Sequence, residues 1–142
     1  MPGLRQPVAV AAAVLALAGP GCAPSEPGRP SPAAAVAPAD QPLVDAVSAL
    51  CDARREADGA VPAARGIFYD RSHDAMHELA RRAQATDRAA TARLLEAKNK
   101  VEQDFLYPRT WELLGDDLAR LDEAARAALQ VLRIGAPAAC AT

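Results

Sequence analysis

The pattern of apolar and polar residues divides the chain into three parts. An apolar run at residues 8–18 is followed by a proline-rich stretch, residues 23–40, in which apolar residues show no regular spacing. From residue 41 to residue 142, apolar residues recur every three or four positions. This spacing places them on one face of a helix, whereas a strand would need strict alternation. The third part is therefore predicted to be all-helical.

Four helices are predicted in this third part. Asp40 is a good N-cap for the first helix, Gly59 is a natural C-terminal stop, and Pro108 ends the third helix. The predicted helices cover about residues 40–59, 62–84, 86–107 and 110–135, and the last begins at residue 116 if Gly115 breaks it. Short connections between successive helices favour antiparallel neighbours, so we expect an up-down-up-down four-helix bundle.

The predicted core consists of the apolar positions that recur along each helix. They are Leu43, Val44, Val47, Leu50 and Cys51, then Ala64, Phe68, Ala75, Met76, Leu79 and Ala83, then Ala90, Leu94, Ala97, Val101 and Phe105, and finally Trp111, Leu114, Leu118, Leu121, Ala125, Leu129 and Leu132. Most of these side chains are small or aliphatic, so the predicted core is poor in aromatic residues.

The N-terminal segment resembles the signal peptide of a bacterial lipoprotein. Arg5 precedes the apolar run, and three small residues lead from it into Cys22. The resemblance implies export, cleavage before Cys22 and a lipid on that cysteine. The family prefers leucine at the third position before the cysteine, and this chain has Gly19 there. Plain secretion with cleavage after Ala18 is the alternative; an uncleaved anchor is disfavoured, because about 20 apolar residues are needed to span a bilayer.

These observations define the expected organisation of the chain. Residues 1–21 form the signal peptide, residues 22–40 a disordered spacer, and residues 41–142 one helical domain. The spacer is rich in proline and alanine, which favours an extended and semi-rigid chain. Behind a lipidated cysteine, such a spacer would hold the domain away from the membrane surface.

The three cysteines, Cys22, Cys51 and Cys140, support export. An odd number in an exported chain needs an explanation, and lipidation of Cys22 would leave one pair. Outside the cytoplasm, a disulfide between Cys51 and Cys140 can form and persist. The alternative is two separate buried thiols, because free cysteine packs well in protein cores.

The two histidines of the chain provide the only candidate for site chemistry. His73 and His77 lie four positions apart, so both imidazoles share one face of a helix. Imidazole binds zinc and copper, and Asp70 and Asp74 each lie three residues before a histidine, where they would act as ligands or orient a ring. The spacing is not the His-Glu-x-x-His motif of zinc proteases.

The helical phase places these histidines away from the predicted core. Phe68 and Leu79 mark the apolar side of the helix, so both imidazoles are expected to face solvent. A solvated polar face, a partner-binding patch and a copper or zinc site all fit this position. If the third helix packs antiparallel to the second, Glu96 and Glu102 are the nearest carboxylates on it. A haem site that uses Met76 or a histidine fits this phase poorly.

The composition excludes one class of function but does not identify the function itself. The net charge is −2, and the basic residues are scattered among acidic ones, so no stripe for nucleic acid is present. Residues 68–105 resemble those of small helical exported proteins of GC-rich bacteria, a resemblance that implies no activity. We expect a non-catalytic extracytoplasmic bundle, anchored to the membrane by lipid, that binds a partner protein or a metal ion. The alternative is a metal-dependent enzyme that uses His73 and His77.

Overall fold

The computed structural model describes residues 36–140, so Cys22 and the predicted signal peptide lie outside the described residues. The elements in this part are α1 (Gln41–Ala57), α2 (Val61–Arg71), α3 (His73–Ala83), α4 (Arg88–Leu106), the 3₁₀ turn η1 (Pro108–Leu113) and α5 (Leu114–Val131). No strand occurs between residues 36 and 140, which confirms the predicted all-helical class. Within the same range, no helix is both long and apolar enough to cross a bilayer.

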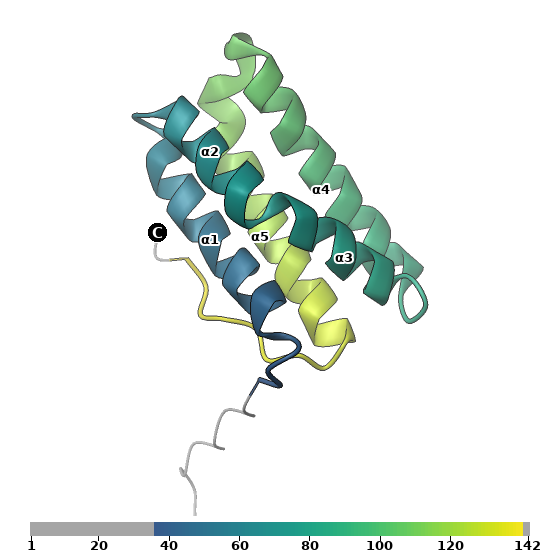
Figure 1. Cartoon of the computed structure of the whole chain (residues 1–142). Coiled ribbons are helices and arrows are strands. Elements are labelled where there is room, and N and C mark those ends of the chain that lie inside the picture. Colours follow the sequence, from purple (N-terminus) through teal and green to yellow (C-terminus); the bar gives the residue numbers. More distant parts are fainter. Residues whose placement is uncertain (1–35, 141–142) are drawn as a thin grey trace, which may run out of the picture. The chain divides into compact units, whose positions relative to one another are not determined.

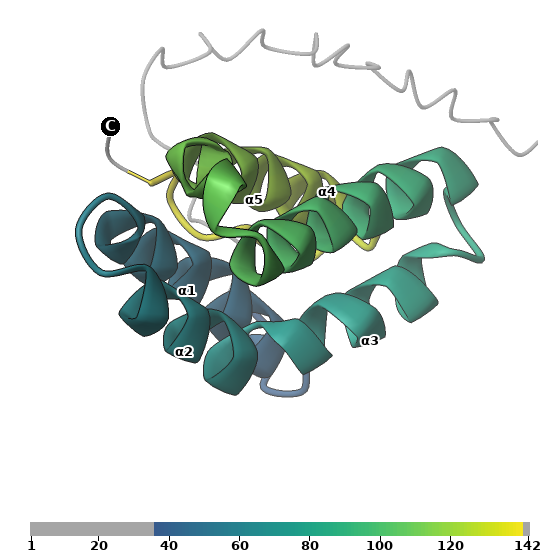
Figure 2. The same cartoon turned by 90° about the horizontal axis from the view of Figure 1, so that it is seen from above.

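The predicted second helix is two helices, α2 and α3, that meet at Ser72. The backbone of Ser72 leaves the helical region, with φ −124° and ψ −40°. Its buried hydroxyl donates a hydrogen bond of 2.9 Å to the backbone oxygen of Ala46 in α1. The prediction of one continuous helix is therefore wrong, and a simple four-helix bundle is not confirmed. Figures 1 and 2 show α2 beside α1, whereas α3 continues along α4.

The core lies between α1, α4 and α5, with α2 and α3 closing one side (Figure 2). Phe68, Leu79, Leu118 and Leu121 are all fully buried, as the apolar spacing predicts. Trp111 is an exception, because 39% of it is exposed. Pro108 begins a 3₁₀ turn after α4, and α5 starts only at Leu114, so Trp111 does not continue the buried stripe of α5.

The C-terminal strap, residues 132–140, folds back along the domain to α1 (Figure 1). The chain turns at Arg133, which has a positive φ of 59°, and the amide of Ile134 donates to the oxygen of Leu129 at 2.9 Å. This is the hydrogen bond of a Schellman C-cap. The sulfur atoms of Cys51 and Cys140 are joined at 2.07 Å. The bonded pair is the one that the parity of the cysteines predicts.

The α4–α5 connection and the N-terminal entry of the chain lie at opposite ends of α1. Gly115, at the start of α5, lies beside the end of α1, and a Cβ atom on it would lie 3.5 Å from a carboxylate oxygen of Asp58. The α4–α5 connection is therefore at the C-terminal end of α1. Residues 36–40 enter the domain at the opposite end of that helix (Figure 1).

Candidate functional site

Aromatic rings form a ladder along α2 and α3. The ring centroids of Tyr69 and His73 are 5.3 Å apart, and those of His73 and His77 are 4.9 Å apart. Asp70 and Asp74 each lie three residues before one of these histidines, and both are exposed. We call these five residues the histidine face.

The two histidines of α3 have different surroundings. His73 is half-buried, and its ring packs edge-on against Phe68 with centroids 5.9 Å apart. His77 is exposed. The prediction that both rings face solvent is therefore correct for His77 and wrong for His73. His73, at the start of α3, reaches Glu102 of α4, whereas His77 lies one turn further on.

Both nitrogens of His73 lie beside carboxylates. Nδ1 is 2.9 Å from Oδ1 of Asp74, and Nε2 is 2.9 Å from Oε1 of Glu102 on α4. The other oxygen of Glu102 is 2.9 Å from Nζ of Lys98, a lysine that is only 2% exposed. Of the two carboxylates expected opposite the histidines, Glu102 is in contact with His73, whereas Glu96 lines a different surface.

The charges around this face shift two pKa values. Burial lowers the pKa of His77 below 6.5, and the positive charges of Lys98 and His73 lower it further against the opposing effect of Glu102 and Asp74. Burial acts to raise the pKa of Glu102, but the contacts with Lys98 and His73 outweigh it, so that pKa falls below 4.5. At neutral pH, His77 is therefore uncharged and keeps a free lone pair, and Glu102 is ionised.

The structure brings only part of the predicted ligand set together. Asp74 lies against His73, whereas no hydrogen bond or ion pair to Asp70 is found among residues 36–140. In the same range, one group of three ligand atoms lies within 4.8 Å of one another, and it contains Cys51, Cys140 and Asp122. The two sulfurs of that group are already joined to each other. A three-ligand site at the histidines would thus require rotation of a side chain.

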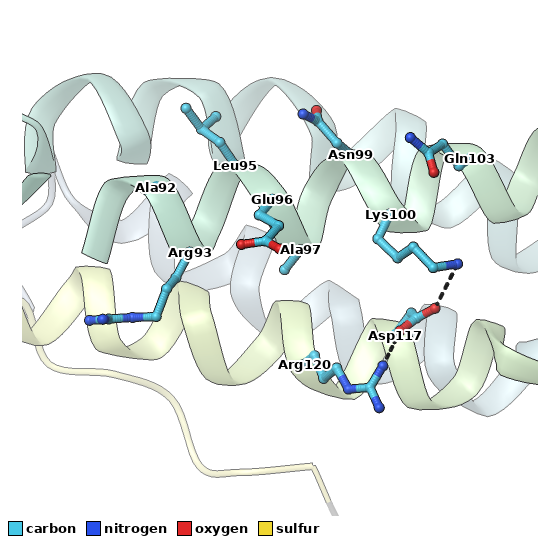
Figure 3. A pocket seen from close by; sticks show the side chains of 10 residues that line it. All are labelled: Ala92, Arg93, Leu95, Glu96, Ala97, Asn99, Lys100, Gln103, Asp117 and Arg120. Atoms are coloured by element: carbon cyan, nitrogen blue, oxygen red, sulfur yellow. Dashed lines mark hydrogen bonds and ion pairs between the residues drawn. The ribbon is translucent and has the colours of Figure 1, made fainter. Parts of the chain in front are cut away.

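A second polar surface is a groove between α4 and α5, with a volume of about 840 Å³ (Figure 3). Lys100 of α4 lies 2.5 Å from Oδ1 of Asp104 and reaches 3.2 Å across to Oδ2 of Asp117 on α5. Arg120 donates to the other oxygen of Asp117 at 2.6 Å. Arg93 and Glu96 line the same groove. Sequence reasoning missed this groove because its lining comes from two helices that are distant along the chain.

The carboxylates behind this groove are buried. Asp104 and Asp117 are 0% and 2% exposed; Oδ2 of Asp104 lacks a hydrogen-bond partner, and Oδ2 of Asp117 has the 3.2 Å ion pair with Lys100. Burial acts to raise the pKa of Asp117, but its contacts with Asp104, Lys100 and Arg120 outweigh it and hold the pKa below 3.8. The cluster therefore joins α4 to α5 through charge, with Lys100 at its solvent side.

The third surface is apolar and lies at the α4–α5 connection. Leu106, Tyr107, Trp111 and Leu113 are 60%, 61%, 39% and 45% exposed. We call these four residues the apolar corner. The sequence signal that could have revealed it is Pro108, because a proline between two predicted helices leaves the flanking apolar residues outside regular helix.

No protein-family model, no curated protein and no solved structure matches this chain. The functional argument below therefore rests on the geometry and chemistry of its own residues.

Proposed function

We propose that this protein is a non-catalytic extracytoplasmic binding protein, held at the membrane by lipid on Cys22, and that it binds a partner protein through the apolar corner. The observation that carries the proposal is the exposure of Leu106, Tyr107, Trp111 and Leu113 within one short connection. Exposed apolar side chains that are clustered, unlike single scattered ones, are typical of interaction sites.

The residue types at the corner support a protein partner. Trp111 is the single tryptophan of the chain and Tyr107 is one of its two tyrosines. Tryptophan and tyrosine are enriched among the residues that dominate binding energy in protein interfaces. Arg109 and Glu112 are exposed beside them and would form a polar rim. An apolar centre with a charged rim is the usual composition of a protein-binding patch.

The position of the corner fits the proposed anchor. Residues 36–40 enter at the start of α1, and the apolar corner lies at the other end of that helix (Figure 1). Residues 38–40 form a turn and Val36 packs on the core, so an extended spacer of 14 steps, from residue 22 to residue 36, would reach roughly 43 Å at about 3.1 Å per residue. A domain tethered in this way would present the corner to proteins beyond the membrane surface.

We also propose that the scaffold is the expected up-down-up-down four-helix bundle in modified form. In this arrangement α2 and α3 together take the place of the second helix. Contacts of α2 with α1, of α3 with α4, and of α5 with both α1 and α4 support it.

Site-specific photo-crosslinking in the producing cells tests the binding site. A crosslinking amino acid at Trp111 or Leu113 is expected to give a discrete adduct with one other protein. The matched control is the same probe at Ala89, which is exposed in the first turn of α4. Equal adducts at Ala89 would overturn the proposal, as would adducts only with lipid or with a second copy of the chain.

The anchor is tested separately by intact-mass measurement of the native protein. A chain that begins at Cys22 and carries acyl groups is the expected result. An unmodified chain that begins at Gly19 would show plain secretion and rule out the anchor. Several acyl groups are expected, because a single acyl chain holds a protein at a membrane only marginally.

A further inference from the structure

We propose that the histidine face binds a copper(II) ion, with Nδ1 of His73, a carboxylate oxygen of Asp74 and a ring nitrogen of His77 as ligands. This site lies on α3 and is distinct from the apolar corner, so it goes beyond the proposed function. Imidazole and carboxylate groups in a nearly square arrangement are typical ligands of copper(II).

The first step is the distance between two of the ligand atoms. Nδ1 of His73 and Oδ1 of Asp74 are 2.9 Å apart. Two atoms at this separation, each about 2.05 Å from one ion, subtend an angle of about 90° at that ion. Tetrahedral zinc would need a separation of about 3.3 Å at the same bond lengths. The pair therefore fits two adjacent positions of a tetragonal ion, and copper(II) also heads the affinity order of divalent metals.

The second step is the support behind His73. Glu102 holds Nε2 at 2.9 Å, and Lys98 in turn holds Glu102 at 2.9 Å. A carboxylate on the far nitrogen fixes the tautomer and the orientation of a ligand histidine. Nε2–H donates to Glu102, and the proton that Nδ1 donates to Oδ1 of exposed Asp74 is the one that a metal ion would displace. The half-buried ring is thus already oriented for binding an ion on the outer side.

The third step is the position of His77. Its ring centroid lies 4.9 Å from that of His73, one helical turn further on, and the side chain is exposed. Rotation of an exposed side chain costs little, so His77 can bring a nitrogen to the same ion.

The last step is the charge around the ligands. Asp70 and Asp74 have no arginine or lysine at ion-pair distance within residues 36–140. The nearby arginines are engaged elsewhere, because Arg71 pairs with Asp52 at 2.7 Å and Arg81 with Glu78 at 2.6 Å. The outer side of the histidine face therefore carries negative charge that a divalent cation would offset. The remaining positions on the ion would be open to water.

Copper(II) titration of the untagged full chain tests the proposal. The chain should carry Cys22→Ser, because a free thiol would itself bind or reduce copper. We expect one copper(II) ion by calorimetry and an electron paramagnetic resonance spectrum with couplings from two imidazole nitrogens. His77→Ala should remove one of these nitrogens and weaken binding at least tenfold, and Asp74→Asn should weaken it without changing the nitrogen count. The control Glu123→Gln changes an exposed carboxylate on α5 and should leave the affinity unchanged.

Two results would overturn the site. One is that the parent chain binds copper(II) no more tightly than the His73→Ala/His77→Ala double variant. The other is that His77→Ala leaves the nitrogen couplings unchanged. Melting curves without copper show whether each variant is folded, and His77→Ala decides the outcome if His73→Ala unfolds the protein. The crosslinking result at the apolar corner is independent of both.

Discussion

The two sides of α4 carry the same charge motif and use it in opposite ways. Lys98 and Glu102 face α3, and Lys100 and Asp104 face α5; each lysine pairs with the acid four residues later. In the first pair the lysine is buried, with 3% of its side chain exposed, and the acid is 24% exposed. In the second pair the acid is fully buried and the lysine side chain is 40% exposed.

This difference shows that the sequence spacing of a charge pair does not define its role. On the α3 side, the buried cation holds a carboxylate that reaches out to His73. On the α5 side, buried carboxylates from two helices meet beneath an exposed cation. The first arrangement supports a surface site, and the second joins two helices. Because a buried charge that loses its partner is costly, each pair has one residue whose removal should be severe.

The largest effect is expected on the α3 side. Glu102→Ala removes the one carboxylate at ion-pair distance from Lys98 among residues 36–140 and leaves a buried ammonium group. Loss of one partner of a buried ion pair costs about 3–5 kcal/mol. Urea unfolding at pH 7 should show this loss, and Glu96→Ala, an exposed change on the same helix, should stay within about 0.5 kcal/mol. Similar stabilities for the two variants would contradict the burial of Lys98.

A smaller loss is expected on the α5 side. Lys100→Met leaves Asp104 and Asp117 buried with Arg120 as the remaining cation at ion-pair distance in the described chain. Hydrogen bonds to charged groups contribute about 1.5–3 kcal/mol, and the partial exposure of Lys100 keeps the effect in that range. Chemical unfolding is again the measurement. Lys100→Arg keeps the charge and should recover most of the loss; an equal loss in both variants would show that charge is not the cause.

As the pH falls, the α3 side of α4 should lose stability before the α5 side does. His77 and Glu102 both have lowered pKa values in the folded state. The stability that His77 contributes is therefore full above pH 6.5, and that of Glu102 is full above pH 4.5. Each contribution is lost as the pH falls through the lower pKa of the folded state. The contribution of Asp117 is full above 3.8 and is lost only below it. Each group changes stability by at most about 1.4 kcal/mol per pH unit.

Urea unfolding from pH 7 to pH 2 checks this order. Glu102→Gln should flatten the curve in the range that begins near pH 4.5, and Asp117→Asn should flatten it only below pH 3.8. The reverse order would show that the histidine side does not depend on ionised Glu102.

The smallest effects distinguish the two histidines. His73→Ala removes a half-buried ring that contacts Glu102 and Phe68, and it should cost about 1 kcal/mol, as lost hydrogen bonds typically do. His77→Ala changes an exposed ring and should stay within about 0.5 kcal/mol. Thermal melts of both variants in metal-free buffer make the comparison. Equal values would mean that the contacts of His73 with Glu102 and Phe68 contribute nothing to stability.

Part of the candidate site was predictable from the sequence. The spacing of His73 and His77 places them on one helical face, and antiparallel packing of neighbouring helices placed Glu102 near them. Their unequal burial was not predictable, because it depends on the packing of His73 against Phe68 and against Glu102 of α4. The apolar corner was missed for a related reason: Trp111 fits the helical spacing of the next segment, and only the 3₁₀ turn takes it out of that helix.

By itself, the sequence determined the local features of this protein. Helical spacing specifies most of the helices, and the cysteine count leaves Cys51 and Cys140 as a pair once Cys22 is assigned to a lipid. Tertiary structure alone decided where α2 gives way to α3, which member of each charge pair on α4 is buried, and that Trp111 is exposed. The physical reason is range: spacing and capping act within a few residues, whereas burial depends on which distant helix packs against each face.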